Sequence, residues 1–576
     1  MMKRSLCIFL SVTLSVAVAC LYKSAHSAPA PGLASARPLD GLVPDGALLY
    51  IEARDFAGLL RDWNSSPEKA KWLESDDHSV FSRSRLFLRL QRFFERFGRA
   101  AGLPADTSFA VQAAGQESAL ALYDIGKIEF VYVTRLGSAD FLHSELWKSR
   151  NKLQPRMAAG TPFYLGRDDR SGHVVGFAVA GDYLVLSTRE DLIVRTLQLL
   201  NKQPERSLHQ EAWFTAALAA APPVAGDLRM VLDLKSISVE GHFSTYWVQQ
   251  NISEMKGYTA AICDLYREAN AYREERVLLR KPVEQENARS QPPDIINTLL
   301  AALPEDHGFY QARTAAPGLV FRTLQGSIFL SMEKPSAVQR QAPQVVLTGG
   351  EVGSASDLET RLDAPSARPD GTDSASAALR VLLENAGAFA FLEAQGTRRN
   401  SDGVLLTTPT LLVIAGSQPW EANAVQQAIS AQLTSILSAS ELGLKWKQVD
   451  EAGGWFELDG LHPLQIALRD KLLYVSTQRE MLQAALQSHA GAKHQPNVTY
   501  IAGFNHARER NNFYKLSAWI DSTPGETYTW GTPTPRFFSR NMAGLSQALA
   551  RLDSEEVVER EESSKVFQTV TYRWAQ

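Results

Sequence analysis

Five arginines recur at helical spacing and form the clearest candidate binding site in the sequence. They are Arg85, Arg89, Arg92, Arg96 and Arg99. At 100° per residue they fall within an arc of about 80°, and leucines and phenylalanines occupy an adjacent face. Such a stripe could bind an anionic membrane surface, lipopolysaccharide or an acidic envelope protein. The alternative is a solvated helix face whose arginines pair with acids elsewhere.

Two Ser-Thr pairs recur in similar surroundings, Ser187-Thr188 and Ser476-Thr477. Each pair follows an apolar strand pattern and precedes a helical pattern. A repeated hydroxyl pair could suggest nucleophilic catalysis, but its place at a strand–helix junction favours a structural role. We predict that Thr188 and Thr477 cap the two helices, with Asp191 and Glu480 as the reciprocal capping-box acids.

No other pattern indicates a catalytic, metal or cofactor site. The sequence contains no phosphate-binding loop, dinucleotide-binding glycine pattern, His-Glu-x-x-His motif or Cys-x-x-Cys pair. His489 and His494 have no third ligand nearby, and Ser546 lies in a helical pattern without the closing glycine of a nucleophile elbow. We expect no cofactor and no catalytic residue, although a hydrolase whose residues assemble only in the fold stays open.

The N-terminus has the pattern of an export signal, which we place at residues 1–27. Lys3 and Arg4 precede an apolar run over residues 6–22, and small residues follow. Cleavage after residue 27 would release the protein, whereas a lipobox-like ending at Cys20 would leave that cysteine lipidated. A retained N-terminal anchor is a third option. We therefore expect an exported protein, either periplasmic, extracellular or an outer-membrane lipoprotein.

The composition is that of a soluble globular protein with more than one core. The chain has 576 residues and is 45% hydrophobic, and single cores stop growing at roughly 250 to 300 residues. Removal of the signal would change the formal net charge from -4 to -7, which disfavours binding to nucleic acid. Cys263 is the one cysteine beyond the signal. We predict it to be a buried small side chain in a helical segment.

Several patterns recur in the same order and predict two diverged copies of one α+β fold. Each copy opens with a Pro-acid turn followed by a strand that contains a tyrosine, Tyr50 or Tyr310. The predicted order is a tether at 28–40, a first repeat at 41–280, a linker at 281–297 and a second repeat at 298–576 that includes a low-complexity loop at 335–376.

Matching strand patterns run through both copies. The pairs are 118–124 with 387–393, 130–133 with 411–414, and 229–234 with 499–504. The first pair alternates small and large apolar residues, which is the period of a strand. A polar loop over 397–402 is expected in the second copy where the first has a turn at Gly126-Lys127. We predict a predominantly antiparallel sheet with helices on one face, in each copy.

Three of these motifs carry a resemblance to a bacterial family. They are the opening Leu-Val-Pro-Asp-Gly-Ala-Leu-Leu-Tyr-Ile-Glu at 42–52, the strand ending in Leu-Ser-Thr at 186–188, and the terminal Val-Phe-Gln-Thr-Val-Thr-Tyr at 566–572. Together they resemble the family named domain of unknown function 3352, over residues 42–574. The resemblance implies an exported bacterial protein and brings no activity, cofactor or catalytic residue.

We therefore expect an exported, noncatalytic envelope protein with a binding or scaffolding role in the periplasm or at the cell surface. Its partner would be an envelope protein or an anionic membrane surface. A further hypothesis is a carrier of an apolar or lipid ligand, which would require a large apolar cavity.

Overall fold

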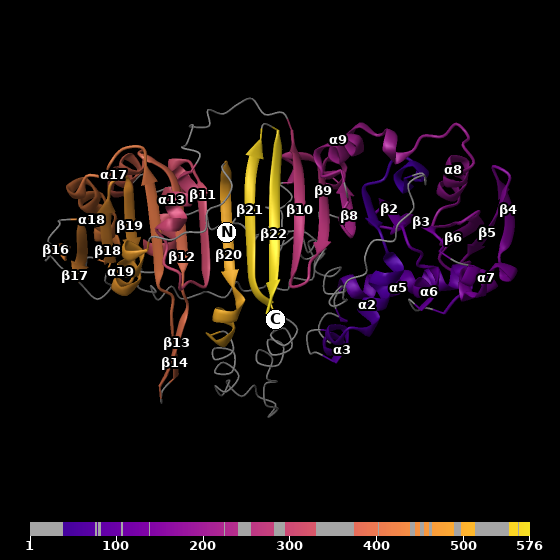
Figure 1. Ribbon diagram of the computed structural model, residues 1–576, viewed down its shortest axis with the longest axis horizontal. Helices are drawn as coiled ribbons and strands as arrows, with labels where there is room; N and C mark the ends of the chain where they lie inside the picture. Colours follow the sequence, from indigo (N-terminus) through magenta and orange to yellow (C-terminus); the bar gives the residue numbers. More distant parts are fainter. Residues whose placement is uncertain are drawn as a thin grey trace, which may run out of the picture. The chain divides into compact units, whose positions relative to one another are not determined.

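The computed structural model describes residues 38–74, 78, 82–83, 85–104, 108–137, 139–223, 225–239, 255–281, 294–329, 374–400, 403–437, 444–449, 454–459, 464–488, 497–512, 552–562 and 564–575. The predicted export signal with Cys20, the two loop histidines and Ser546 lie outside these residues. The described chain divides into two compact units. Unit 1 holds the residues up to 281, drawn in indigo to magenta, and unit 2 holds most of those from 294 onward, including β21 up to residue 561 (Figure 1).

Unit 1 contains an antiparallel sheet, because each strand pairs in reverse direction with its neighbours. In spatial order the strands are β4 (Gln154–Ala158), β5 (Thr161–Arg167), β6 (Val174–Ala180), β7 (Tyr183–Ser187), β3 (Glu129–Arg135), β2 (Ser118–Asp124), β1 (Leu49–Ala53), β8 (Leu228–Leu232), β9 (Tyr258–Arg267) and β10 (Ala271–Arg280).

Helices cover both faces of this sheet. The helical segments are η1 (Leu39–Leu42), α2 (Phe56–Ser65), α3 (Pro67–Glu74), α5 (Arg85–Ala101), α6 (Ser108–Ala113), η2 (Ala139–His143), α7 (Glu145–Ser149), η3 (Arg150–Lys152), α8 (Glu190–Leu200), η4 (Leu208–Gln210), α9 (Ala212–Ala220) and α10 (Leu234–Ile237). Phe177 of β6 packs in a cluster with α5, whereas the next residue, Ala178, packs in a cluster with α8. Successive side chains of a strand point to opposite faces, so the two helices lie on opposite sides.

Unit 2 contains an antiparallel sheet of its own. In spatial order its strands are β16 (Lys445–Gln448), β17 (Trp455–Asp459), β18 (Leu464–Arg469), β19 (Leu472–Ser476), β15 (Thr410–Gly416), β12 (Ala386–Glu393), β11 (Phe309–Thr314), β20 (Val498–Asn505) and β21 (Leu552–Glu562). The last strand of the chain is β22 (Lys565–Trp574). The α+β class and the antiparallel sheet predicted from the sequence are therefore confirmed.

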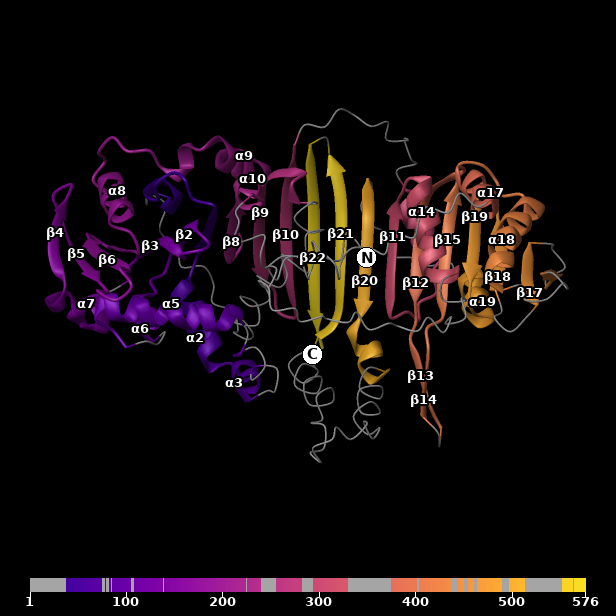
Figure 2. The same ribbon diagram turned by 180° about the vertical axis from the view of Figure 1, so that it is seen from behind.

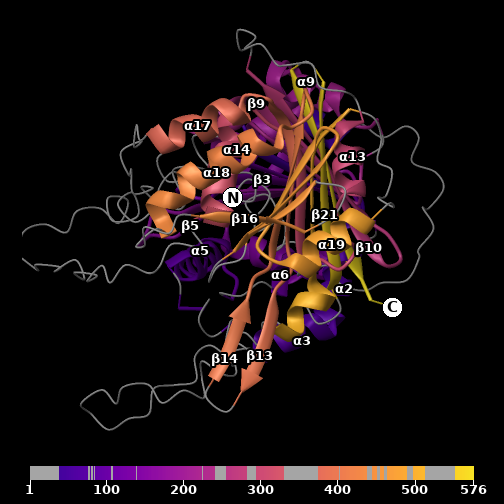
Figure 3. The same cartoon turned by 90° about the vertical axis from the view of Figure 1, so that its left-hand side faces the viewer.

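The helical segments of unit 2 also lie on both faces of its sheet. They include α13 (Ile295–Ala301), α14 (Pro317–Leu324), the π-helical η5 (Gln325–Phe329), α17 (Ser374–Leu383), α18 (Ala422–Leu437) and α19 (Arg479–Gln487). Phe389 and Phe391 of β12 pack with α14, α17 and α18. The alternating Ala388 and Ala390 pack with α13 and α19. Figure 3 shows α14, α17 and α18 on one side of these strands and α13 and α19 on the other.

Two expectations from the sequence are wrong here. Helices do not cover a single face of either sheet, and the reason is visible in β12, which is buried at every position from Ala386 to Leu392. A strand buried on both sides needs cover on both sides. The expected polar loop over 397–402 belongs instead to a two-stranded hairpin of β13 (Gly396–Asn400) and β14 (Gly403–Thr407), which extends beyond β12 and β15 (Figure 2).

The Ser-Thr pair of unit 1 bonds to a neighbouring strand and does not cap α8. Ser187 lies opposite Val131 in the ladder of β7 and β3. Its Oγ donates to the carbonyl oxygen of Phe130 at 2.9 Å, and Thr188 Oγ1 accepts from the N–H of Phe130 at 2.9 Å. The N-cap of α8 is Arg189, whose side chain makes no capping bond. The predicted capping box is therefore wrong, because the hydroxyls satisfy backbone groups just beyond the ladder.

Unit 2 repeats this arrangement. We call the two hydroxyl hydrogen bonds from a Ser-Thr pair to one residue of the neighbouring strand the strand latch. Ser476 Oγ donates to the carbonyl oxygen of Thr410 at 3.1 Å, and Thr477 Oγ1 accepts from the N–H of Thr410 at 2.9 Å. The N-cap of α19 is Gln478, again without a side-chain bond. The helix capping expected of both pairs is therefore wrong, and their hydroxyls bond to a strand instead.

Cys263 is buried, as predicted, but it lies in strand β9 and not in a helix. It pairs with Arg276 of β10 across the ladder. The apolar run around it fits a short helix or a strand buried on both faces, and periodicity alone does not separate the two.

Candidate functional site

The arginine stripe lies on α5, which is held against the sheet by its apolar face. Phe97 is 2% exposed and packs in one cluster with Phe177. Phe93 is half-buried, and its ring centroid lies 6.2 Å from that of Phe130 and 5.5 Å from that of His173. With these rings against the sheet, Arg92, Arg96 and Arg99 lie on the outer side of the helix, where all three are exposed.

The structure gives the arginines different surroundings. Arg92 and Arg96 are exposed and line a cavity. Arg89 lines the same cavity and donates to the carbonyl oxygen of Gly126. Arg99 instead donates from Nε to Asp168 Oδ2 at 3.2 Å. The side chain of Arg85 lies outside the described part of the structure.

The cavity has a volume of about 910 Å³ and lies where strands β3, β6 and β7 begin or end. Four segments line it: residues 88, 89, 92, 93 and 96 of α5, the turn at 126–129, the loop at 171–174, and residues 188–191 at the start of α8. Its volume falls in the usual range of ligand sites. The fold thus brings together the two features that the sequence made conspicuous, the arginine stripe and the first Ser-Thr unit.

Positive charge exceeds negative charge in the lining, which contains five arginines and lysines and three carboxylates. Arg189 pairs with Glu129 at 3.2 Å and with Asp191 at 2.5 Å. Lys127 lies 3.9 Å from Glu129. Arg92 and Arg96 form no hydrogen bond or ion pair with any residue that the structure describes.

The start of α8 adds charges of both signs to the lining. Its first turn borders the cavity through Glu190 and Asp191, and the N-terminus of a helix carries a partial positive charge. Glu190 lies 3.9 Å from Arg156 and Asp191 is paired with Arg189. The acids of this turn are thus partly neutralised by cations outside the arginine stripe. Among the residues that the structure describes, Arg92 and Arg96 are the arginines of the lining with no ion pair or hydrogen bond.

Two titratable groups beside α5 are perturbed. Burial, together with the nearby charge of Arg96, lowers the pKa of His173 below its ordinary value, so this imidazole is neutral at neutral pH. Hydrogen bonds from Ser171 and then from Arg99 lower the pKa of Asp168 to about 2. Asp168 is therefore ionised and fixes the C-terminal half of α5 to the loop that borders the cavity.

Ser171, His173 and Asp168 occur within one turn, but their geometry is not that of a catalytic triad. Ser171 Oγ donates directly to Asp168 Oδ2 at 2.5 Å. His173 contributes its backbone N–H to Ser171 Oγ at 3.4 Å. In a triad the imidazole stands between the hydroxyl and the carboxylate. This loop therefore gives no support to the hydrolase hypothesis.

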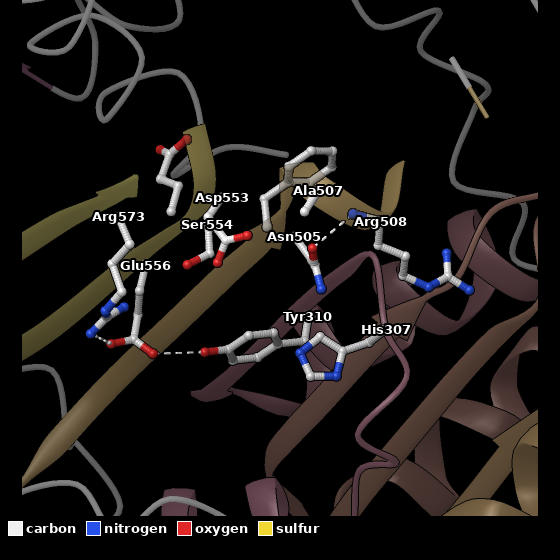
Figure 4. Close-up of a pocket in the computed structure, with 11 residues that line it drawn as sticks. His307, Tyr310, Asn505, Ala507, Arg508, Asp553, Ser554, Glu556 and Arg573 are labelled. Atoms are coloured by element: carbon white, nitrogen blue, oxygen red, sulfur yellow. Dashed lines mark hydrogen bonds and ion pairs between the residues drawn. The ribbon is translucent and has the colours of Figure 1, made fainter. Parts of the chain in front are cut away.

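A second cavity, of about 420 Å³, lies in unit 2 (Figure 4). Tyr310 donates to Glu556 Oε2 at 2.9 Å, and Arg573 lies 4.0 Å from Glu556. Arg508 bonds to Asp306 at 2.6 Å and lies against Glu509. Burial raises the pKa of Tyr310, so its hydroxyl stays protonated. Both arginines of this cavity, Arg508 and Arg573, are thus paired with carboxylates, which distinguishes it from the cavity on α5.

Neither a metal centre nor a membrane-spanning helix is found in the described residues. No group of three or more His, Cys, Asp and Glu residues there could hold a metal ion. Within the same part of the chain, no helix combines the length and the hydropathy needed to cross a bilayer.

No family model and no curated protein matches the chain. Two solved structures are similar to it, described as "Structure of crystal form I of TP0453" and "Structure of crystal form III of TP0453". The sequence identities are 15% and 13%, the TM-scores are 0.25 and 0.24, and the matches cover 44% of this chain and 82% and 84% of the other chains.

The sequence predicted a turn at Gly126-Lys127, but it did not assign that turn or the loop at 171–174 to the site, where both line the cavity beside the arginines. Lys127 and His173 follow glycines in ordinary turn contexts, so nothing local marks them as site residues. Their role arises because the strands that they join end beside α5.

Proposed function

We propose that this chain is an exported, noncatalytic binding protein of the bacterial envelope, and that the cavity on α5 holds an anionic group. The observation that carries the proposal is the pair Arg92 and Arg96, which line a cavity of about 910 Å³ and have no ion pair with any described residue. Export is supported by the N-terminal sequence, in which Lys3 and Arg4 precede an apolar run. The resemblance to the domain of unknown function 3352 family belongs to the same proposal.

The charge distribution favours binding over a purely structural role for the stripe. Arginines that stabilise a fold are paired, as Arg99 is with Asp168 and Arg229 is with Asp264. Guanidinium groups bind carboxylates and phosphates through two parallel hydrogen bonds. A concave site with an excess of positive charge also raises the local concentration of anionic ligands. The protein as a whole has a formal net charge of -4. An anion would therefore be attracted to this cavity and not to the surface in general.

We further propose that the two units arose by duplication of one ancestral fold. Strand order supports this proposal, since β1 lies between β2 and β8 just as β11 lies between β12 and β20. The order continues on both sides through matching strands, and the strand latch occurs in both units.

The sites of the two units differ. At the position of the stripe, unit 2 has α17, where the guanidinium carbon of Arg380 lies 4.2 Å from the ring centroid of Phe321. That arginine serves packing. We therefore assign anion binding to unit 1.

The test is equilibrium binding of inorganic phosphate and pyrophosphate, measured by calorimetry at low salt. The variant Arg92→Gln/Arg96→Gln should bind pyrophosphate about tenfold or more weakly, as expected for loss of charge-assisted hydrogen bonds. The matched control is Arg61→Gln/Lys202→Gln, which removes two exposed cations of unit 1 outside the cavity lining. Equal loss in both variants would mean nonspecific attraction, and no binding to the unmodified protein would overturn the proposal.

A further inference from the structure

The turn that closes the cavity on α5 contains a strained aliphatic residue. Ile128 has a φ of 58°, in the left-handed region where a β-branched side chain is a clear outlier. The turn joins β2 to β3, and hairpin turns that need this conformation normally place glycine there. An isoleucine in this conformation therefore lowers the stability of the fold relative to a glycine at the same position.

The strained side chain borders the proposed binding site. Ile128 is half-buried and lines the cavity, as does Leu88 of α5, which is 42% exposed. The hydrogen bond from Arg89 to Gly126 holds α5 against the turn that carries Ile128. Apolar and cationic side chains thus line the same cavity. Retained strain at a cavity points to a role in binding, since the fold itself would be more stable without it.

Resting on the proposed function, we propose that the ligand is an amphipathic anion, with a phosphate-type head on Arg92 and Arg96 and an aliphatic chain against Ile128 and Leu88. The head would replace the water that solvates the two guanidinium groups. The chain would cover the leucine and the isoleucine, whose exposed surface favours contact with another apolar group. A free phosphate and a phosphorylated amphiphile share the head chemistry, and they differ in whether the apolar side chains contribute.

The first experiment compares soluble probes by calorimetry: inorganic phosphate, octyl phosphate below its micelle concentration, and the uncharged octyl glucoside. Octyl phosphate should bind at one equivalent and more tightly than phosphate, by about fourfold for each methylene that becomes buried. Octyl glucoside should bind more weakly than octyl phosphate. If phosphate and octyl phosphate bind equally, the inference is overturned while the proposed function stands. If no anion binds, both fail.

The second experiment separates binding from stability. Ile128→Gly should weaken octyl phosphate binding about tenfold, as expected for loss of a buried aliphatic contact, and should weaken it by a larger factor than phosphate binding. The variant should also raise the thermal midpoint, because the strain is relieved. The matched control is Ala159→Gly, a second non-glycine residue with positive φ, at 49°, outside the cavity lining. It should raise the midpoint without changing either affinity. Unchanged octyl phosphate affinity in Ile128→Gly would overturn the inference.

A third measurement decides whether the amphiphile is taken from a membrane or from solution. Vesicles of phosphatidylcholine with phosphatidic acid are sedimented with the protein, and vesicles of phosphatidylcholine alone serve as the reference. Retention on the anionic vesicles that is lost in Ile128→Gly supports a lipid ligand in this cavity. Retention that is the same in Ile128→Gly and the unmodified protein contradicts it.

Discussion

The hydroxyl of Ser187 donates a 2.9 Å hydrogen bond to the carbonyl oxygen of Phe130, a residue 57 positions earlier in the chain. Ser187 is fully buried at the end of β7, and Phe130 lies near the start of β3. The bond fixes the end of β7, from which the chain passes through Thr188 into α8. It therefore positions the helix start that borders the cavity.

Loss of the strand latch should destabilise either unit. Ser187→Ala and Ser476→Ala each remove one hydrogen bond to a carbonyl oxygen that still accepts from the N–H of Thr188 or Thr477. We therefore expect each to lower the free energy of unfolding by about 0.5 to 1.5 kcal/mol. Denaturant unfolding measures this change. Glu480 is the residue that the sequence pattern assigned to a capping box. Glu480→Ala should lower the free energy of unfolding by about 0.5 kcal/mol or less. A cost equal to that of Ser476→Ala would restore the capping hypothesis.

The buried ion pair of unit 1 gives a second prediction. Arg229 bonds to Asp264 through two hydrogen bonds of 2.8 and 2.7 Å, and both side chains are buried. Asp264→Ala should lower the free energy of unfolding by about 3 to 5 kcal/mol, because it leaves a buried guanidinium unpaired. The double variant Arg229→Met/Asp264→Leu should recover most of that loss. A double variant as unstable as the single one would show that the charge pair itself is needed for folding.

Stability should depend on pH through Asp168. Its pKa lies at about 2 in the folded chain and at an ordinary 3.8 when unperturbed. A depressed carboxyl pKa stabilises the fold above the ordinary value, and this contribution is lost as the pH falls from about 4 toward 2. Asp168→Asn should therefore flatten the decline of the unfolding midpoint in that window. Asp169→Asn, at the exposed neighbouring residue, should leave the decline unchanged, and equal behaviour of the two variants would contradict the assignment.

The thiol of Cys263 should be unreactive in the folded protein. It is 2% exposed, and burial raises its pKa well above the ordinary value. Because the thiolate is the nucleophile, iodoacetamide should alkylate Cys263 slowly in buffer and rapidly in denaturant. Mass spectrometry of the modified peptide measures the rate. Val239→Cys provides a reactive control, since Val239 is 76% exposed, and comparable rates at the two positions would show that the core around β9 opens readily.

Much of the strand content could be predicted from the sequence, because alternation of small and large apolar residues is a local property. The patterns at 118–124 and 387–393 correspond to β2 and β12, and those at 229–234 and 499–504 to β8 and β20. The helix that carries the arginines could also be predicted, because its helical spacing of arginines and apolar residues is likewise a local property. Cys263 was placed in a helix because β9 is apolar on both faces, and such a run has no period to identify it.

The sequence by itself determined which residues could carry charge to a site, since the spacing of Arg89, Arg92 and Arg96 puts them on one side of any helix. Only the tertiary structure decided what they face. The turn with Ile128 and the start of α8 reach α5 because distant strands pair in one ladder, and pairing between segments far apart depends on the whole sheet. Arg99 carries the same charge at the same spacing, yet the loop at Asp168 engages it and removes it from the cavity.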